Sequence, residues 1–147
     1  MAAAPARAPA SEANAPGPDQ LMAQFDLVQR QLARVDRQLQ ALEQALIEAQ
    51  QALATVRHLA EAKGASEMLL PIGGGVHVRA TIEASKPVLL PIGAGYSTDG
   101  DAADVAAALE QRLKSIQSQF MAASEEAQRL TETAAAINEH LGSLSPN

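Results

Sequence analysis

The sequence predicts an α+β protein, in which a long antiparallel two-helix coiled coil carries two β-hairpins between its helices, and the hairpins join an oligomeric β-barrel hub. Two observations lead to this fold class. In both halves of the chain, apolar residues recur in alternating steps of three and four, the spacing of a coiled-coil seam. Between these halves, the apolar residues alternate with polar ones, as in a strand, and the phrase Leu-Leu-Pro-Ile-Gly occurs twice.

Composition limits the class of protein that the chain can be. Of its 147 residues, 47% are hydrophobic but only 2% are aromatic, which suits long helices better than a thick globular core. The formal net charge of −6 does not favour a nucleic-acid partner. There is no cysteine, so disulfides and thiol chemistry are excluded. Without a signal-peptide core or a long apolar stretch, we expect a cytoplasmic protein with no membrane partner.

The first helix is predicted over 19–63. Residues 1–18, rich in Ala and Pro, are predicted to be a disordered extension, because they bury too little apolar surface to offset ordering entropy. A single domain over 19–147 follows, with Asp19 as the helix N-cap and Gly64 as its stop. The predicted seam consists of Leu21, Phe25, Val28, Leu32, Val35, Leu39, Leu42, Leu46, Ala49, Leu53, Val56 and Ala60.

The second helix is predicted over 101–143. Asp101 is its expected N-cap, and Asp104 stands where a capping box places Glu. Two helices of matched length with a compact connection should fold back on each other as an antiparallel pair. The seam of this helix is predicted to contain Leu109, Leu113, Ile116, Phe120, Ala123, Ala127, Leu130, Ala134, Ile137, Leu141 and Leu144.

Residues 67–98 are predicted to form the two hairpins. Each Leu-Leu-Pro-Ile-Gly phrase is one strand followed by a glycine bend, and Pro71 and Pro91 belong at strand ends, edges or bulges because they have no N–H to donate. A phosphate-binding loop is the competing interpretation. It is disfavoured because strand-like residues follow Gly75 and Gly95, where such a loop needs Lys, then Ser or Thr, and a helix.

The hairpins contain more apolar residues than one coiled coil can cover. Residues 68–72 are apolar without alternation, as in a strand covered on both sides. Isolated hairpins are marginal in water and open apolar edges aggregate, so we expect the hairpins of several subunits to combine in one hub. The oligomerisation residues expected there are Leu69, Leu70, Ile72, Val76, Val78, Ile82, Val88, Leu89, Leu90, Ile92 and Tyr96.

Residues 69–113 carry a resemblance to a known family. The pattern begins with a strand that ends in Pro-hydrophobic-Gly, followed by an alternating strand. A second strand then leads to Gly93, Gly95 and Tyr96, and an acidic helix start follows. In this pattern the chain resembles a prefoldin subunit of the α class, in its archaeal form, over about residues 20–144. In that family two hairpins mark the α class and one hairpin marks the β class.

The resemblance implies a function and a set of partners. It implies a hetero-hexamer of two α and four prefoldin β subunits, whose coiled coils hang from a double β-barrel hub. It also implies ATP-independent binding of unfolded client proteins at the coiled-coil tips and their transfer to a group II chaperonin. In this sequence the client-binding tip would consist of Leu21, Met22, Phe25, Val28, Ile137, Leu141 and Leu144.

Two classes of function stay open. One is this chaperone subunit, and the other is a structural coiled-coil adaptor that assembles through the same hub and binds one dedicated partner. Met22 and Phe25 are equally compatible with simply closing the seam. An enzyme is not expected, and we predict no catalytic, cofactor-binding or metal-binding residues. His58, His77 and His140, for example, lie in separate segments without a second ligand at metal spacing.

Overall fold

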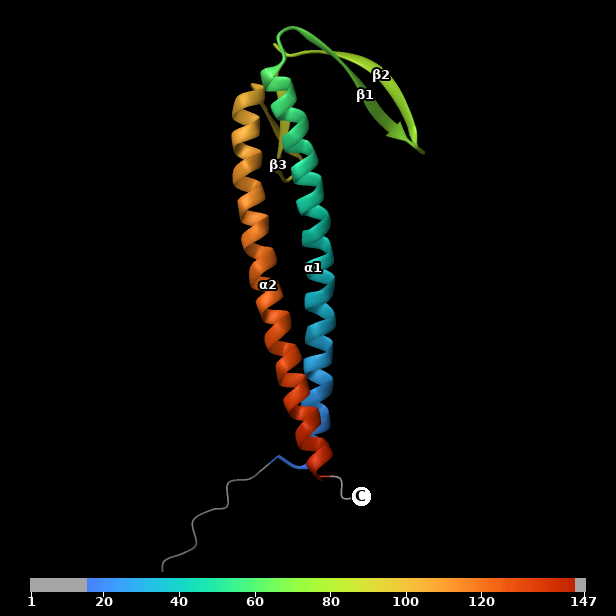
Figure 1. The fold of residues 1–147 in the computed structure, drawn as a ribbon, viewed down its shortest axis with the longest axis vertical. Coiled ribbons are helices and arrows are strands. Elements are labelled where there is room, and N and C mark those ends of the chain that lie inside the picture. Colours follow the sequence, from blue (N-terminus) through green and yellow to red (C-terminus); the bar gives the residue numbers. More distant parts are fainter. Residues whose placement is uncertain (1–15, 145–147) are drawn as a thin grey trace, which may run out of the picture. The chain divides into compact units, whose positions relative to one another are not determined.

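The computed structural model describes residues 16–144. In chain order the elements are α1 (Pro18–Glu61), β1 (Ala65–Gly73), β2 (Val76–Glu83), β3 (Val88–Gly93), β4 (Tyr96–Gly100) and α2 (Ala102–Leu144) (Figure 1). Two long helices with two small antiparallel hairpins between them confirm the predicted α+β fold of the chain, and the oligomeric hub stays a prediction. Residues 1–15 of the predicted extension lie outside the described residues. Neither helix within residues 16–144 carries an apolar stretch that could span a bilayer.

The first turn of α1 differs from the prediction. The Leu21 N–H donates to the Gly17 carbonyl at 3.0 Å, so the helical hydrogen bonding starts at Gly17 and Pro18 opens the helix. Proline fits this position because the first N–H groups of a helix have no intrahelical partner. Asp19 therefore lies inside the first turn, and its assignment as the N-cap is wrong. Its carboxylate still complements the positive end of the helix dipole.

The predicted N-cap of α2 is confirmed, whereas α1 ends at Glu61, two residues before its predicted end. The Asp104 N–H donates to Asp101 Oδ1 at 2.8 Å, which is the N-cap bond expected for α2. The Val105 N–H donates to the Asp101 carbonyl at 3.0 Å and closes the first helical turn. At the end of α1, Gly64 has φ = +106°, a backbone conformation that glycine adopts without steric cost.

The structure divides into two compact units, and the first contains α1 up to Val35 and α2 from Glu126 onward. Within this unit the heptad seam accounts for burial on both helices, as coiled-coil packing requires. Leu21, Val28, Val35 and Ala134 are buried, and Phe25, Leu32, Ala127, Leu130, Ile137 and Leu141 are half-buried.

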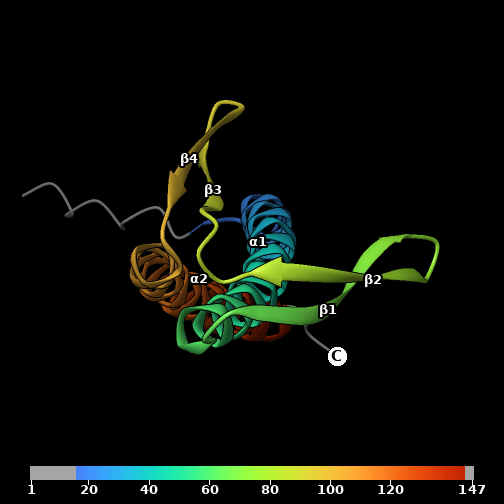
Figure 2. The same ribbon diagram turned by 90° about the horizontal axis from the view of Figure 1, so that it is seen from above.

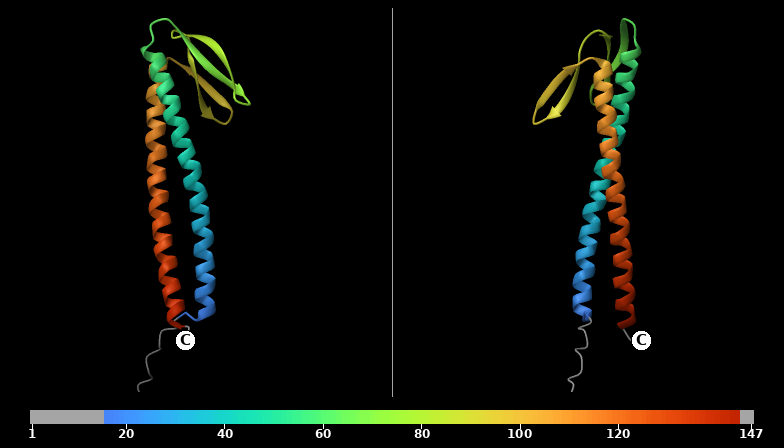
Figure 3. Two further views of the ribbon diagram at one scale, coloured as in Figure 1. Left: turned by 45° about the vertical axis from the view of Figure 1, so that its right-hand side comes forward. Right: turned by 90° about the vertical axis from the view of Figure 1, so that its left-hand side faces the viewer.

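The second unit spans residues 36–125 and contains both hairpins. Its two helix segments run side by side in opposite directions (Figure 3). Their seam widens into a core at the hairpin end, where strand residues Met68, Ile82, Val88 and Leu90 pack against helix residues. The buried residues of this core are Leu53, Val56, Leu59, Ala102, Val105, Ala106 and Leu109.

The seam prediction fails at the hairpin end of both helices. Ala60 is exposed and Leu59 is buried instead, because the last turn of α1 faces the hairpins as well as α2. On α2, Ala102, Val105 and Ala106 are buried although no seam was predicted before Leu109. Extending the steps of three and four backward from Leu109 reaches Ala106 and Ala102, so the signal was present in the sequence.

Candidate functional site

The repeated phrase builds the same local structure in both hairpins. Pro71 pairs with His77 and Gly73 with Val76, which leaves Ile72 as an extra residue on β1. The second hairpin repeats this register, with Ile92 as the extra residue between Pro91 and Gly93. An extra residue on one strand is a β-bulge, and proline is tolerated beside it because the ladder is already interrupted. The prediction that both prolines lie at strand ends, edges or bulges is confirmed.

The glycines of the phrase turn the chain. The two-residue loops Gly74–Gly75 and Ala94–Gly95 have positive φ at all four positions, between 50° and 80°. Such loops are type I′ turns, whose twist matches that of the flanking strands. A strand rather than a helix follows each loop, so the hairpin interpretation holds and the phosphate-loop interpretation does not. The two hairpins form separate two-stranded sheets (Figure 2).

The first hairpin has one apolar face, which is covered only at its base. Residues that pair across an antiparallel ladder share a face, so Leu70 lies with Val78 and Met68 with Ala80. At the base, Met68 and Ile82 pack against the helical core. Farther out on the same face, Leu70 is 43% exposed and Val78 is 46% exposed. The apolar face of the first hairpin is thus covered by the helices at its base and exposed to solvent at its outer end.

The second hairpin repeats this pattern. Val88 and Leu90 pack against the helical core at its base. Beyond them, Ile92 at the bulge is 62% exposed and Tyr96 is 72% exposed. Both hairpins therefore present apolar side chains at their outer ends, at positions fixed by the same bulge and turn.

The predicted oligomerisation residues fall into two groups. Ile82, Val88 and Leu90 pack against the chain's own helices. Residues 68–72 were expected to be covered on both faces, but within one chain the outer half of β1 is uncovered. Leu69, Leu70, Ile72, Val76, Val78, Leu89, Ile92 and Tyr96 are all exposed.

One polar contact attaches the second hairpin to a helix of this unit, and another closes the base of the first hairpin. At the base of the first hairpin, the Ala84 N–H donates to the Gly64 carbonyl at 3.1 Å, which continues the β1–β2 ladder by one step and is not a bond to a helix. Arg112 of α2 donates to the Pro91 carbonyl of β3 at 2.8 Å. Sequence analysis did not identify this contact, because residues 21 positions apart meet only once the fold is known.

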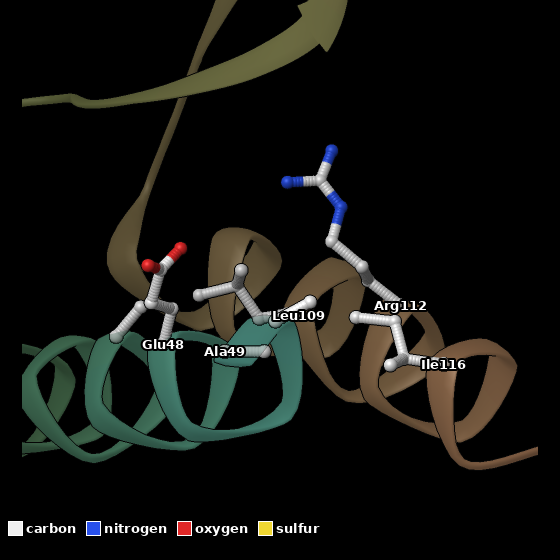
Figure 4. Close-up of a pocket in the computed structure, with 7 residues that line it drawn as sticks. Glu48, Ala49, Leu109, Arg112 and Ile116 are labelled. Atoms are coloured by element: carbon white, nitrogen blue, oxygen red, sulfur yellow. The ribbon is translucent and has the colours of Figure 1, made fainter. Parts of the chain in front are cut away.

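A hollow of about 280 Å³ lies on the helix pair of the second unit, beside Arg112 (Figure 4). It exists because three alanines of α1 leave room opposite larger α2 side chains. Arg112 and Glu48 rise on the same side of the helices at its rim (Figure 4). Within residues 16–144, no three potential metal-ligating side chains gather. The hollow is lined by Ala45, Glu48, Ala49, Ala52, Leu109, Arg112 and Ile116.

The seven predicted client-binding residues all lie in the first unit, where they differ in exposure. Met22 is 59% exposed and Leu144 is 45% exposed. Leu27, which sequence reasoning did not single out, is 55% exposed in the same unit. The sequence did contain a signal for the exposure of Leu27, because this apolar residue lies outside the heptad seam. The other five residues fill the seam: Leu21 and Val28 are buried, and Phe25, Ile137 and Leu141 are half-buried.

Comparison with known proteins identifies the family. The model of the Prefoldin family, described as prefoldin subunit, matches residues 28–145. The chain belongs to the prefoldin family. Prefoldin is a family of chaperones rather than of enzymes. The match begins after Leu27, so Leu21, Met22 and Phe25 lie outside it.

Solved prefoldin structures include a similar chain. It belongs to filamentous PFD from Methanocaldococcus jannaschii, determined by cryo-electron microscopy, and is 18% identical with a TM-score of 0.48. The similarity covers 82% of the present chain and 93% of the other. A search of curated proteins finds no match to the sequence.

Proposed function

We propose that this prefoldin chain is an α-class subunit of an ATP-independent chaperone for non-native proteins. Two hairpins between the helices support the α class, because the β class has one. The family supports the chaperone role, because prefoldin is a family of chaperones, and it also supports assembly with other prefoldin subunits. The proposed assembly contains two copies of this chain and four prefoldin β subunits.

The observation that carries the proposal is the apolar face of each hairpin, which runs from the chain's own core into solvent. Four exposed side chains, Leu70, Ile72, Val76 and Val78, follow Met68 and Ile82 on the first hairpin. Each ladder has only two strands, so its outer edges are open to further strands. Strands from neighbouring subunits would cover the apolar face and pair with these edges, as closure into a barrel requires.

The proposed client site is the set of seven tip residues in the first unit. Met22 and Leu144 are available without rearrangement, and the half-buried seam residues become available when the helix ends part. Residues 127 and 134 on the α2 seam are alanines, so separating the two helix ends exposes less apolar area than it would with larger residues. The free-energy cost of this separation is correspondingly lower. A methionine suits such a surface, because its flexible thioether adapts to many partners.

Two further parts of the proposal come from the family alone. Clients are passed to a group II chaperonin, and the complex works in the cytoplasm without a cofactor. Residues 16–144 offer no helix that could span a membrane, which is compatible with this location.

The first test is assembly. The chain is produced together with a one-hairpin prefoldin subunit from the same organism, and the native mass of the purified complex is measured. We expect a mass of two copies of this chain with four of the partner. A monomer that stays soluble and binds no partner would overturn the hub proposal, because its exposed hairpin residues would then need no cover.

The second test is chaperone activity. The purified complex should slow the aggregation of several unrelated denatured proteins in the absence of ATP. A complex of the expected mass that protects none of them would instead support the adaptor with one dedicated partner. The two tests therefore judge the hub and the client site separately.

A further inference from the structure

The two hairpins share one sequence phrase but are attached to the helices differently. The first hairpin is attached to the helices by packing at its base, where Met68 and Ile82 contact the core, while the Ala84–Gly64 bond only joins its own two strands. The Glu67–Arg79 ion pair also joins the two strands of this hairpin to each other. Within residues 16–144, no helix side chain forms a hydrogen bond to Pro71.

The second hairpin has an attachment that the first lacks. Arg112 Nη2 donates to the carbonyl oxygen of Pro91 at 2.8 Å. Pro91 occupies in β3 the place that Pro71 occupies in β1, directly before the bulge. The guanidinium is rigid and always charged, so it forms a stronger and better-directed hydrogen bond than a neutral donor.

The contacts at the base make this bond a second point of attachment. Val88 and Leu90 of β3 pack on the helical core. At the end of β4, a Cβ added at Gly100 would lie 3.1 Å from Val105 Cγ2, so this strand approaches α2 closely. Base packing alone leaves a two-stranded ribbon free to tilt, whereas a bond farther out at Pro91 fixes the tilt.

We propose that Arg112 is a positioning residue for subunit assembly, which holds the second hairpin in its docking orientation against α2 before any partner binds. The first hairpin, which lacks such a bond, takes its final orientation from the partner. The part of this proposal that concerns partners rests on the hub assembly proposed above. The positioning itself is a property of the single chain.

The positioning can be measured directly because the chain contains no cysteine. Spin labels at Ser97→Cys on β4 and Gln117→Cys on α2 report the orientation of the second hairpin by electron–electron distance measurements. A second pair, Thr81→Cys and Ala54→Cys, reports the first hairpin. Each pair is measured in the full chain with Arg112, with Arg112→Ala and with Arg112→Lys.

We expect a narrow distance distribution for the second hairpin, which broadens in Arg112→Ala and is partly restored in Arg112→Lys, because lysine keeps one donor. The first hairpin should give the same distribution in all three proteins. A second-hairpin distribution that is broad already with Arg112, or that does not change in Arg112→Ala, would overturn the positioning role.

Assembly is then measured as the affinity for the one-hairpin partner. Arg112→Ala should weaken binding about three- to tenfold, the range expected when one hydrogen bond no longer pre-orders the hairpin. Arg129→Ala, which removes a charge from α2 in the other unit, is the control and should bind like the parent chain. Equal affinity of Arg112→Ala and the parent would overturn the role in assembly. Failure of the parent chain itself to bind would count against the proposed function and leave the distance measurement decisive for positioning.

Discussion

Single residues determine how each hairpin turns. Ala94 has φ = +50°, in the left-handed region, where a Cβ costs about 1–2 kcal/mol. The matching position in the first hairpin is Gly74, at φ = +59°, and nothing lies within 4 Å of a Cβ built there. A side chain at position 74 would therefore meet backbone strain but no steric clash.

Exchanging these two residues should change the hairpins in opposite directions. Ala94→Gly relieves the strain, but it also raises the conformational entropy of the unfolded chain, which offsets part of the gain. The net effect should stabilise the second hairpin by about 0.5–1 kcal/mol. Gly74→Ala introduces the strain and should destabilise the first hairpin by about 1 kcal/mol. Amide hydrogen exchange of the two hairpins in each variant measures both effects. Equal exchange rates in the parent and both variants would contradict the strain argument.

The N-cap of α2 is a second residue with a defined contribution. Asp101→Ala removes the oxygen that accepts the Asp104 N–H and should lower the free energy of unfolding by about 1 kcal/mol. Asp99→Ala is the matched control, because it removes the same charge two residues earlier, from the exposed strand β4. Thermal unfolding compares the two. A similar loss in both variants would show that charge, rather than capping, is responsible.

At the scale of elements, the helices could be predicted from sequence because the heptad seam is a local pattern. It fails at Leu59, where a third element joins the packing, since a two-helix pattern contains no information about hairpins, whereas the α2 seam could have been extended back to Ala102. The hairpins could be predicted because alternation, proline and glycine each restrict the backbone locally. The Arg112 bond to Pro91 could not be predicted, because it joins elements that only the tertiary fold brings together.

The seam also sets which apolar helix residues stabilise the fold. Leu53 is 6% exposed within the hairpin-end core, whereas Leu27 is 55% exposed on the same helix. Leu53→Ala should cost about 2–4 kcal/mol, through lost apolar burial and the cavity that remains. Leu27→Ala should change stability by less than about 0.5 kcal/mol. Chemical denaturation of both variants tests this, and equal losses would refute the assigned seam.

At the scale of the whole molecule, the hairpins bear on assembly. Replacing Ile72 and Val76 by Ser removes two exposed apolar side chains without touching the chain's own core. If they are buried between subunits, each replacement should weaken assembly roughly tenfold, from about 1.5 kcal/mol of lost burial. Native mass at decreasing concentration measures this. Ile47→Ser, on an exposed helix position, is the control and should assemble normally.

Client binding belongs to the same scale. Met22→Ser should reduce protection of denatured proteins and leave the mass of the complex unchanged, because Met22 is exposed and far along the sequence from the hairpins. Leu27→Ser is the matched control, with similar exposure in the same unit but outside the proposed client site. Aggregation assays with denatured proteins compare the protection given by the two variants. An equal loss in the two would mean that clients contact the helix surface without regard to the seam.

The open edges of the two-stranded sheets also matter for the supply of this protein in the cell. Each hairpin exposes unpaired backbone groups beside apolar side chains, a combination that recruits strands from any source. We therefore expect a newly made chain that finds no partner to be recognised by the quality-control machinery of the cell. Its synthesis has to be matched to that of its partners, and a surplus would be expected to appear as degraded or precipitated protein rather than as a soluble reserve.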